Sequence, residues 1–148
     1  MARSDVFIDA SYAIALSIQS DVFHPAAIEL SRHLEDTRPR MVTTRAVLLE
    51  IGNALARFRF RSAMIDLLAD FEEDPDVEIV PLTDELFARG LDLLRGRRDK
   101  EWGLTDCVSF VVMQDRGITE ALTADEHFRQ AGFRPLLQSA WWSRSQVR

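Results

Sequence analysis

The sequence predicts an α/β protein, a three-layer αβα fold with a mainly parallel sheet of four or five strands. Short runs rich in Val, Ile and Phe alternate along the chain with longer segments whose apolar residues recur every three or four positions. Strands joined through helices favour a parallel sheet covered on both faces. No repeat, low-complexity tract or Pro/Gly-rich linker divides the chain, so we expect one domain over residues 1–148.

The first predicted elements are one strand and two helices. Val6–Ile8 is β-branched and aromatic and ends at Asp9, which suits a buried strand that opens into a turn. Tyr12–Ile18 is expected to be helical. Phe23–His33 carries apolar residues at helical spacing, and Thr37-Arg38-Pro39 ends that helix.

The next predicted strand is Met41-Val42, and two helices follow it. The pair Thr43-Thr44 can cap a helix whose apolar residues run from Val47 to Phe58. A further helix carries its apolar residues from Met64 to Phe71, and Asp74-Pro75 ends it.

The second half of the chain repeats the pattern. Val77–Val80 is a predicted strand, and Thr83 begins a helix that continues to Leu94. Leu104–Gln114 is apolar nearly all round and closes with Arg116-Gly117, a helix-stop signal, so we expect a buried helix.

The last predicted elements are the strand Glu120–Thr123, a short helix over Asp125–Gln130 and the strand Arg134–Leu137. Ligands of open α/β sheets gather outside the carboxyl ends of the strands. Acidic residues at those ends are therefore the first candidates for a functional site.

Composition narrows the class of protein. No stretch of the 148 residues is long and apolar enough to cross a bilayer, and the N-terminus lacks a signal-peptide cleavage site, so a cytoplasmic protein is expected. Cys107 is the single cysteine and cannot form an internal disulfide. The three histidines are scattered, and we interpret each as a surface or capping residue. They are His24, His33 and His127.

The net charge of −6 argues weakly against a nucleic-acid partner, because phosphate binding usually accompanies a basic surface. The basic residues are nevertheless clustered, and one cluster is Arg57, Arg59 and Arg61. A solvated surface is its simplest interpretation. The alternative is electrostatic attraction of RNA or of an acidic partner.

Two aspartates follow predicted strands. Asp9 comes directly after the first strand, and Asp125 lies just beyond Ala121-Leu122-Thr123. Both positions place a carboxylate near the crevice of the sheet. Each aspartate is also suited to cap the helix that follows it.

Two further acids lie in predicted helices. Glu50 is surrounded in sequence by apolar residues and shares its helix face with Asn53; it either points outward or contributes to a site. Asp106 lies in the first turn of the most apolar predicted helix. A carboxylate there also interacts favourably with the helix dipole, which stabilises the helix by roughly 0.3 to 1 kcal/mol.

These four acids can meet in one crevice, because both helices begin near strand ends. Hard cations such as Mg²⁺ need only a few carboxylate oxygens and keep several waters. Such a metal lowers the pKa of bound water and stabilises charge on a phosphoryl group. The residues by themselves thus lead to a candidate site for metal-assisted phosphoester chemistry.

Four motifs occur in a characteristic order. They are VFIDAS ending at Ser11, TTRAVLLEIGNAL from Thr43, LTDCVSFVVMQDRGI from Leu104 and ALTADEHFRQAGF from Ala121. In this order and spacing they resemble the four-acid pattern of PIN domains, particularly those of VapC-like toxins, and the resemblance spans nearly the whole chain. One departure is Ala10, where many relatives have a serine or threonine.

The resemblance implies an endoribonuclease that depends on Mg²⁺ or Mn²⁺ held by Asp9, Glu50, Asp106 and Asp125. It further implies hydroxyl or polar neighbours of these acids, for which this chain offers Ser11, Asn53, Thr105 and Thr123. VapC-like proteins are usually homodimers that a small antitoxin protein neutralises. We therefore expect a toxin of a toxin–antitoxin pair with an RNA substrate and no membrane partner.

Three alternatives to a toxin are compatible with the sequence. The first is a PIN ribonuclease without an antitoxin, and the second is a PIN fold that binds RNA or protein without cutting it. The third is a phosphohydrolase with Asp9 as nucleophile, although such enzymes generally have a second aspartate where this chain has Ser11.

Overall fold

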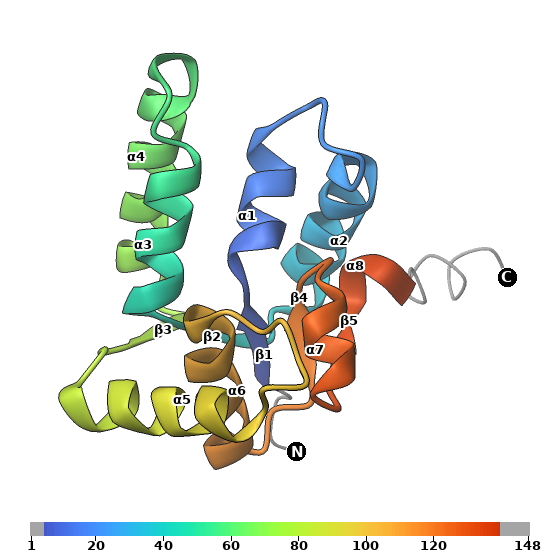
Figure 1. Cartoon of the computed structure of the whole chain (residues 1–148). Coiled ribbons are helices and arrows are strands. Elements are labelled where there is room, and N and C mark those ends of the chain that lie inside the picture. Colours follow the sequence, from blue (N-terminus) through green and yellow to red (C-terminus); the bar gives the residue numbers. More distant parts are fainter. Residues whose placement is uncertain (1–4, 140–148) are drawn as a thin grey trace, which may run out of the picture.

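The computed structural model describes residues 5–139, which form a five-stranded sheet between two layers of helices (Figure 1). All strands are parallel, in the order β3-β2-β1-β4-β5. The strands are β1 (Asp5–Ile8), β2 (Arg40–Thr44), β3 (Val77–Val80), β4 (Glu120–Leu122) and β5 (Arg134–Pro135). The predicted three-layer fold is confirmed.

Within residues 5–139, two helices follow each of β1, β2 and β3, and one helix follows each of β4 and β5. They are α1 (Ala10–Ser17), α2 (His24–Thr37), α3 (Arg45–Ala54), α4 (Phe58–Glu73), α5 (Asp84–Gly96), α6 (Leu104–Arg116), α7 (Glu126–Gln130) and α8 (Leu136–Ser139). The predicted cap at Thr44 is present, since Thr44 accepts a hydrogen bond from a backbone N–H in the first turn of α3. Thr83 caps the start of α5 in the same way. Within residues 5–139 the structure has no helix of the length and hydropathy needed to span a membrane.

Two predicted elements were wrong in detail. The helix after β2 ends at Ala54, where Leu55 closes the last turn, so Phe58 begins α4 instead of ending α3. Strand β5 is only two residues long, and Leu136 turns into α8 where the sequence predicted a longer strand. Pro135 has no N–H to offer a strand ladder, and the backbone N–H of Leu137 instead donates to the Thr123 carbonyl at 3.1 Å.

The sheet separates two apolar clusters because successive strand side chains point to opposite faces. Phe7 packs with α3, α5 and α6, whereas Val6 and Ile8 pack with α1, α2 and α8. Each large side chain that is fully buried contributes roughly 1.5 to 3 kcal/mol relative to exposure. Helix α6 lies deepest, with seven consecutive buried residues from Cys107 to Met113, which confirms the predicted buried helix.

The parallel order brings three strand ends to one edge of the sheet. Strands β2, β1 and β4 are neighbours, and at their carboxyl ends α1, α3 and the turn before α7 begin. The backbone N–H of Asp9 donates to the carbonyl of Leu122 at 3.2 Å, which ties the end of β1 to that of β4. This edge is where the predicted acids are found.

Candidate functional site

Asp9 is held at the centre of this edge. It is only 4 % exposed, it directly follows β1, and it caps α1 by accepting a hydrogen bond from the backbone N–H of Ser11. Burial disfavours the ionised form and raises the pKa of Asp9, and the nearby Asp106 carboxylate adds to the rise. The hydrogen bonds to its charged form act in the opposite direction.

Two hydroxyl groups fix the Asp9 carboxylate. Thr123 Oγ1 donates to Asp9 Oδ2 at 2.8 Å, and Ser11 Oγ donates to the same oxygen at 2.9 Å. These hydroxyls accept hydrogen bonds in turn from the backbone N–H groups of Asp125 and Ala124, both at 3.0 Å. Within residues 5–139, every hydrogen bond to this carboxylate reaches Oδ2, so Oδ1 is left for another ligand.

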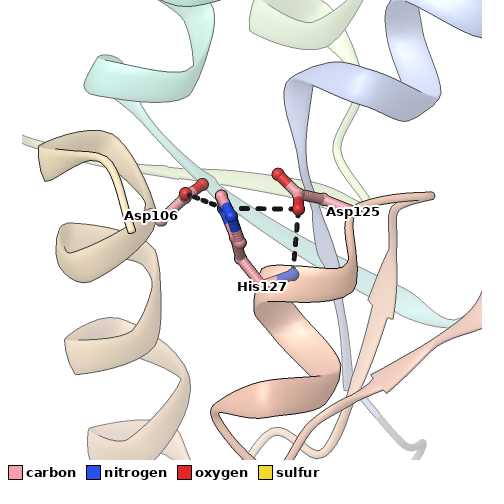
Figure 2. A group of neighbouring side chains, drawn as sticks. All are labelled: Asp106, Asp125 and His127. Carbon is pink, nitrogen blue, oxygen red and sulfur yellow. Dashed lines mark hydrogen bonds and ion pairs between the residues drawn. The ribbon is translucent and has the colours of Figure 1, made fainter. Parts of the chain in front are cut away.

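Asp106 and Asp125 meet around the imidazole of His127 (Figure 2). His127 Nδ1 lies 3.0 Å from Asp106 Oδ2 and 3.4 Å from Asp125 Oδ1. The backbone N–H of His127 donates to Asp125 Oδ1 at 2.9 Å, and that of Gly103 donates to Asp106 Oδ2 at 3.1 Å. One ligand atom from each of the three side chains lies within 4.8 Å of the other two, a spacing that suits a shared metal ion.

Glu50 completes the acidic cluster from the other side of the crevice. It is the sixth residue of α3 and is exposed as a residue, but its carboxyl group is partly desolvated. Desolvation first, and then repulsion from Asp9, Asp106 and Asp125, raises its pKa to about 7. Glu50 therefore shares the crevice with the other three acids, which answers the question that its apolar sequence neighbours left open.

Burial and mutual repulsion both disfavour full ionisation of the acids in the crevice. Desolvation raises the pKa of Asp106, and Asp125 raises it further, whereas hydrogen bonds from His127 and Gly103 act against that rise. Carboxylates that repel one another when ionised are stabilised by a cation placed between them. The donor set and its electrostatics thus fit a divalent metal.

The capping interpretation also holds for the three aspartates. Asp9 caps α1, Asp125 caps α7, and Asp106 accepts a hydrogen bond from a backbone N–H at the start of α6. Because a capping carboxylate uses one oxygen for backbone N–H groups, its other oxygen stays available. Capping and shared ligation are therefore compatible.

The expected polar neighbours divide into two pairs. Ser11 and Thr123 contact Asp9 directly, as described above. Asn53 and Thr105 instead line a groove of about 270 Å³ beside Glu50, together with apolar side chains that include Leu49 and Phe87. In the described part of the chain, neither of this second pair has a hydrogen bond to the four acids.

His127 is the residue that sequence reasoning missed. It was interpreted as a surface or capping residue, yet its side chain is only 28 % exposed and lies between two carboxylates. The available signal was its position two residues after Asp125 at the start of a helix, where a capping Asp125 side chain accepts a hydrogen bond from the backbone N–H of His127. His24 does have a local role, with its Nδ1 2.7 Å from the carbonyl of Ala15.

Comparisons with known proteins agree with the fold described above. The family model of the PIN domain matches residues 6–134. The chain is 28 % identical over 128 residues to the 23S rRNA-specific endonuclease VapC20 of Mycobacterium tuberculosis, in both strains CDC 1551 and H37Rv, covering 86 % of this chain and 95 % of the relative. The crystal structure of VapC20, described as a Sarcin-Ricin loop cleaving toxin, superposes with a TM-score of 0.75 at 27 % identity over the same shares of the two chains.

Proposed function

The chain belongs to the PIN domain family, and on that basis we propose that it is an endoribonuclease acting as the toxin of a toxin–antitoxin pair. The observation that carries the proposal is the convergence of Asp9, Glu50, Asp106 and Asp125 at one edge of the sheet, from four separate segments of the chain. Likeness to a 23S rRNA-specific endonuclease supports RNA as the substrate.

The four acids are proposed to hold Mg²⁺ or Mn²⁺. Both are hard cations that prefer carboxylate oxygens. Burial and mutual repulsion raise the pKa values of Asp9, Glu50 and Asp106, which supports a cation between them. When bound there, such a metal makes water more acidic and stabilises charge on a phosphoryl group.

The side chains of this protein supply the positioning. Thr123 and Ser11 hold Asp9 through Oδ2, so the direction of the carboxylate is fixed before any ligand arrives. The backbone N–H groups of Ala124 and Asp125 orient these hydroxyls, which couples Asp9 to the start of α7. A preorganised set of metal ligands loses little conformational entropy when the metal binds. Mutation of residues that orient such ligands typically reduces metal affinity or activity by about 10- to 100-fold.

His127 is proposed to position Asp106 and Asp125. Its ring lies between their carboxylates, and its backbone N–H holds one of them, so the spacing of the two acids depends on this residue. Asn53 and Thr105 are proposed to contact RNA in the groove beside Glu50, since their polar groups border the acids without bonding to them.

The partners follow from the proposed class. A toxin of this kind is paired with an antitoxin protein, acts on RNA in the cytoplasm, and is expected to form a homodimer. Size-exclusion chromatography with light scattering measures the last of these directly. A non-toxin PIN ribonuclease would have the same site, so the antitoxin is identified by copurification from cells that express the neighbouring reading frame.

Cleavage of a labelled RNA hairpin tests the proposed activity. We expect cleavage with Mg²⁺ or Mn²⁺, none in chelator, and none by the Asp9→Asn variant, which keeps the side-chain shape and removes the ligand charge. Asp36→Asn is the matched control, because Asp36 is exposed on α2 and lies outside the crevice. Undiminished cleavage by pure Asp9→Asn protein would show that the activity, or the site, is assigned wrongly.

A further inference from the structure

The segment that begins α4 combines positive charge with apolar exposure. Its residues 57–61 read Arg-Phe-Arg-Phe-Arg, in a chain whose net charge is −6. Phe58 is 95 % exposed, the largest exposed fraction among the large apolar side chains of the described residues. We name this segment, residues 57–61, the arginine tip. It lies at the far end of the α3–α4 pair from the sheet (Figure 1).

Helix geometry separates the two phenylalanines of the tip. Residues two apart on a helix point to nearly opposite sides, and Phe60 accordingly packs against the core while Phe58 faces solvent. The guanidinium of Arg59 lies over the Phe60 ring, 4.6 Å from its centroid. Arg61, three residues after Phe58, shares the exposed side.

The arginines of the tip keep their charge uncompensated. Arg61 donates through Nη2 to the carbonyl of Ala56 at 2.9 Å, which fixes its side chain beside the turn. Among residues 5–139, no carboxylate forms an ion pair with Arg57, Arg59 or Arg61. By contrast, most other arginines of the structure have such a partner, including Arg45, Arg89 and Arg116.

A continuous exposed strip connects the tip to the acidic crevice. Glu50, Asn53 and Ala54 are exposed and recur at helical spacing, so they share one side of α3. Arg57, in the turn that follows α3, is also exposed. Glu50 and Phe58 are eight positions apart in the chain, which limits the distance between their Cα atoms to less than about 28 Å. A single folded RNA element can therefore contact the crevice and the tip together.

We propose that the arginine tip binds the RNA substrate outside the cleavage site, with Phe58 stacked on an unpaired base and the three arginines contacting phosphates. Unpaired bases stack on aromatic side chains whatever their sequence, and arginine both stacks and binds phosphate. RNA matches both features of the tip, whereas an acidic protein segment matches only its charge. The inference rests on the proposed ribonuclease function and adds a second contact to it.

RNA binding measured in chelator separates the contributions of the tip. Fluorescence anisotropy of a labelled RNA hairpin with an unpaired loop reports affinity without cleavage. We expect Phe58→Ala to weaken binding by roughly 5- to 100-fold, as removal of a stacking aromatic does, and Phe58→Trp to restore it. Phe58→Leu, which keeps an apolar side chain without a ring face for stacking, should behave like Phe58→Ala. Because Phe58 is exposed, none of these changes should lower the melting temperature.

The charge contribution has a matched control in this chain. Changing Arg57, Arg59 and Arg61 together to Gln should lower the slope of log affinity against log salt by about 2, at about 0.7 per phosphate on a single strand. The triple change of Arg95, Arg97 and Arg98 to Gln alters net charge equally, but Arg95 and Arg97 already pair with Asp92 and Asp99. This control should leave the slope close to that of wild type.

The outcomes distinguish the tip from the active site. With Mn²⁺, the tip variants should raise KM and leave kcat within about twofold, since the tip binds RNA away from the cleaved bond. Wild-type protein that cleaves no RNA would contradict the proposed function itself. Wild-type cleavage with unchanged affinity in Phe58→Ala and in the triple variant would overturn the proposed role of the tip. Loss of binding to poly-glutamate, with RNA affinity unchanged, would assign the tip to an acidic protein instead.

Discussion

Glu50 on α3 and Glu78 on β3 are two glutamates whose carboxyl groups have opposite surroundings. Glu78 lies on β3 between the guanidinium groups of Arg40 and Arg116, and hydrogen bonds from them lower its pKa to about 2. Glu50 lies on α3 with three other acids nearby, and its pKa is raised to about 7. A compensated acid of this kind stabilises the fold, whereas an uncompensated one is available to bind a cation.

The two glutamates have different pKa values because they lie at different positions relative to the sheet. Glu78 is within β3 and pairs in register with Val42 of β2, where arginines from two other elements reach it. Glu50 is beyond the carboxyl end of β2, where the strands end in Asp9 and in the turn that carries Asp125. No basic side chain among residues 5–139 forms an ion pair with Glu50.

The largest expected contrast is in activity. Glu50→Gln should reduce the rate of RNA cleavage by about 100-fold or more. Loss of a residue that orients a metal ligand typically lowers activity by about 10- to 100-fold, and loss of a proposed ligand should lower it at least as much. Glu78→Gln should stay within about twofold of wild type, because its carboxylate contacts only arginines. Single-turnover cleavage with Mn²⁺ measures both. An equal loss of cleavage rate in the two variants would show that Glu50 has no greater role in catalysis than Glu78.

The next contrast concerns stabilisation by metal. A ligand that binds only the folded state at 100 times its Kd adds about 2.7 kcal/mol to the free energy of unfolding. Wild type and Glu78→Gln should both show this gain on adding Mn²⁺, and Asp106→Asn should lose most of it. Urea unfolding with and without Mn²⁺ gives the three values. An undiminished gain in Asp106→Asn would place the metal elsewhere.

The smallest contrast is in the pH dependence of stability without metal. The pKa of Glu50 rises from 4.5 to about 7 on folding, so the folded state binds more protons in this window and its stability falls as pH rises from about 4.5 to 7. The pKa of Glu78 falls from 4.5 to about 2, so its contribution is present above pH 4.5 and is lost as pH falls toward 2.

Two variants measure these opposite effects in chelator. Glu50→Gln should be more stable than wild type at pH 8 and similar to it at pH 4, and Glu78→Gln should be less stable at pH 8. Each difference should be about 1 kcal/mol, because both carboxyl groups are partly solvated and solvent screens their interactions. The same sign of change for both variants at pH 8 would contradict the distinction between a compensated and an uncompensated acid.

The sequence by itself determined the order and type of nearly all elements. Strand β1, the caps at Thr44 and Thr83 and the buried helix α6 all follow from interactions between residues a few positions apart, which a linear pattern records. It also determined the four acids as candidates, because three of them lie where a strand ends or a helix begins. The break after Ala54 and the turn at Leu136 were missed, since packing of the chain and not local spacing fixes both.

Only the tertiary structure decided which side chains meet. Thr123 bonds to Asp9 across 114 positions and His127 reaches Asp106 across 21, because parallel pairing of β1 with β4 brings their carboxyl ends together. The direction of Glu50 depended in the same way on where α3 lies relative to α6 and α1. Local sequence records which residues can cap a helix or end a strand, but the charge that each carboxylate faces is set by elements far away in the chain.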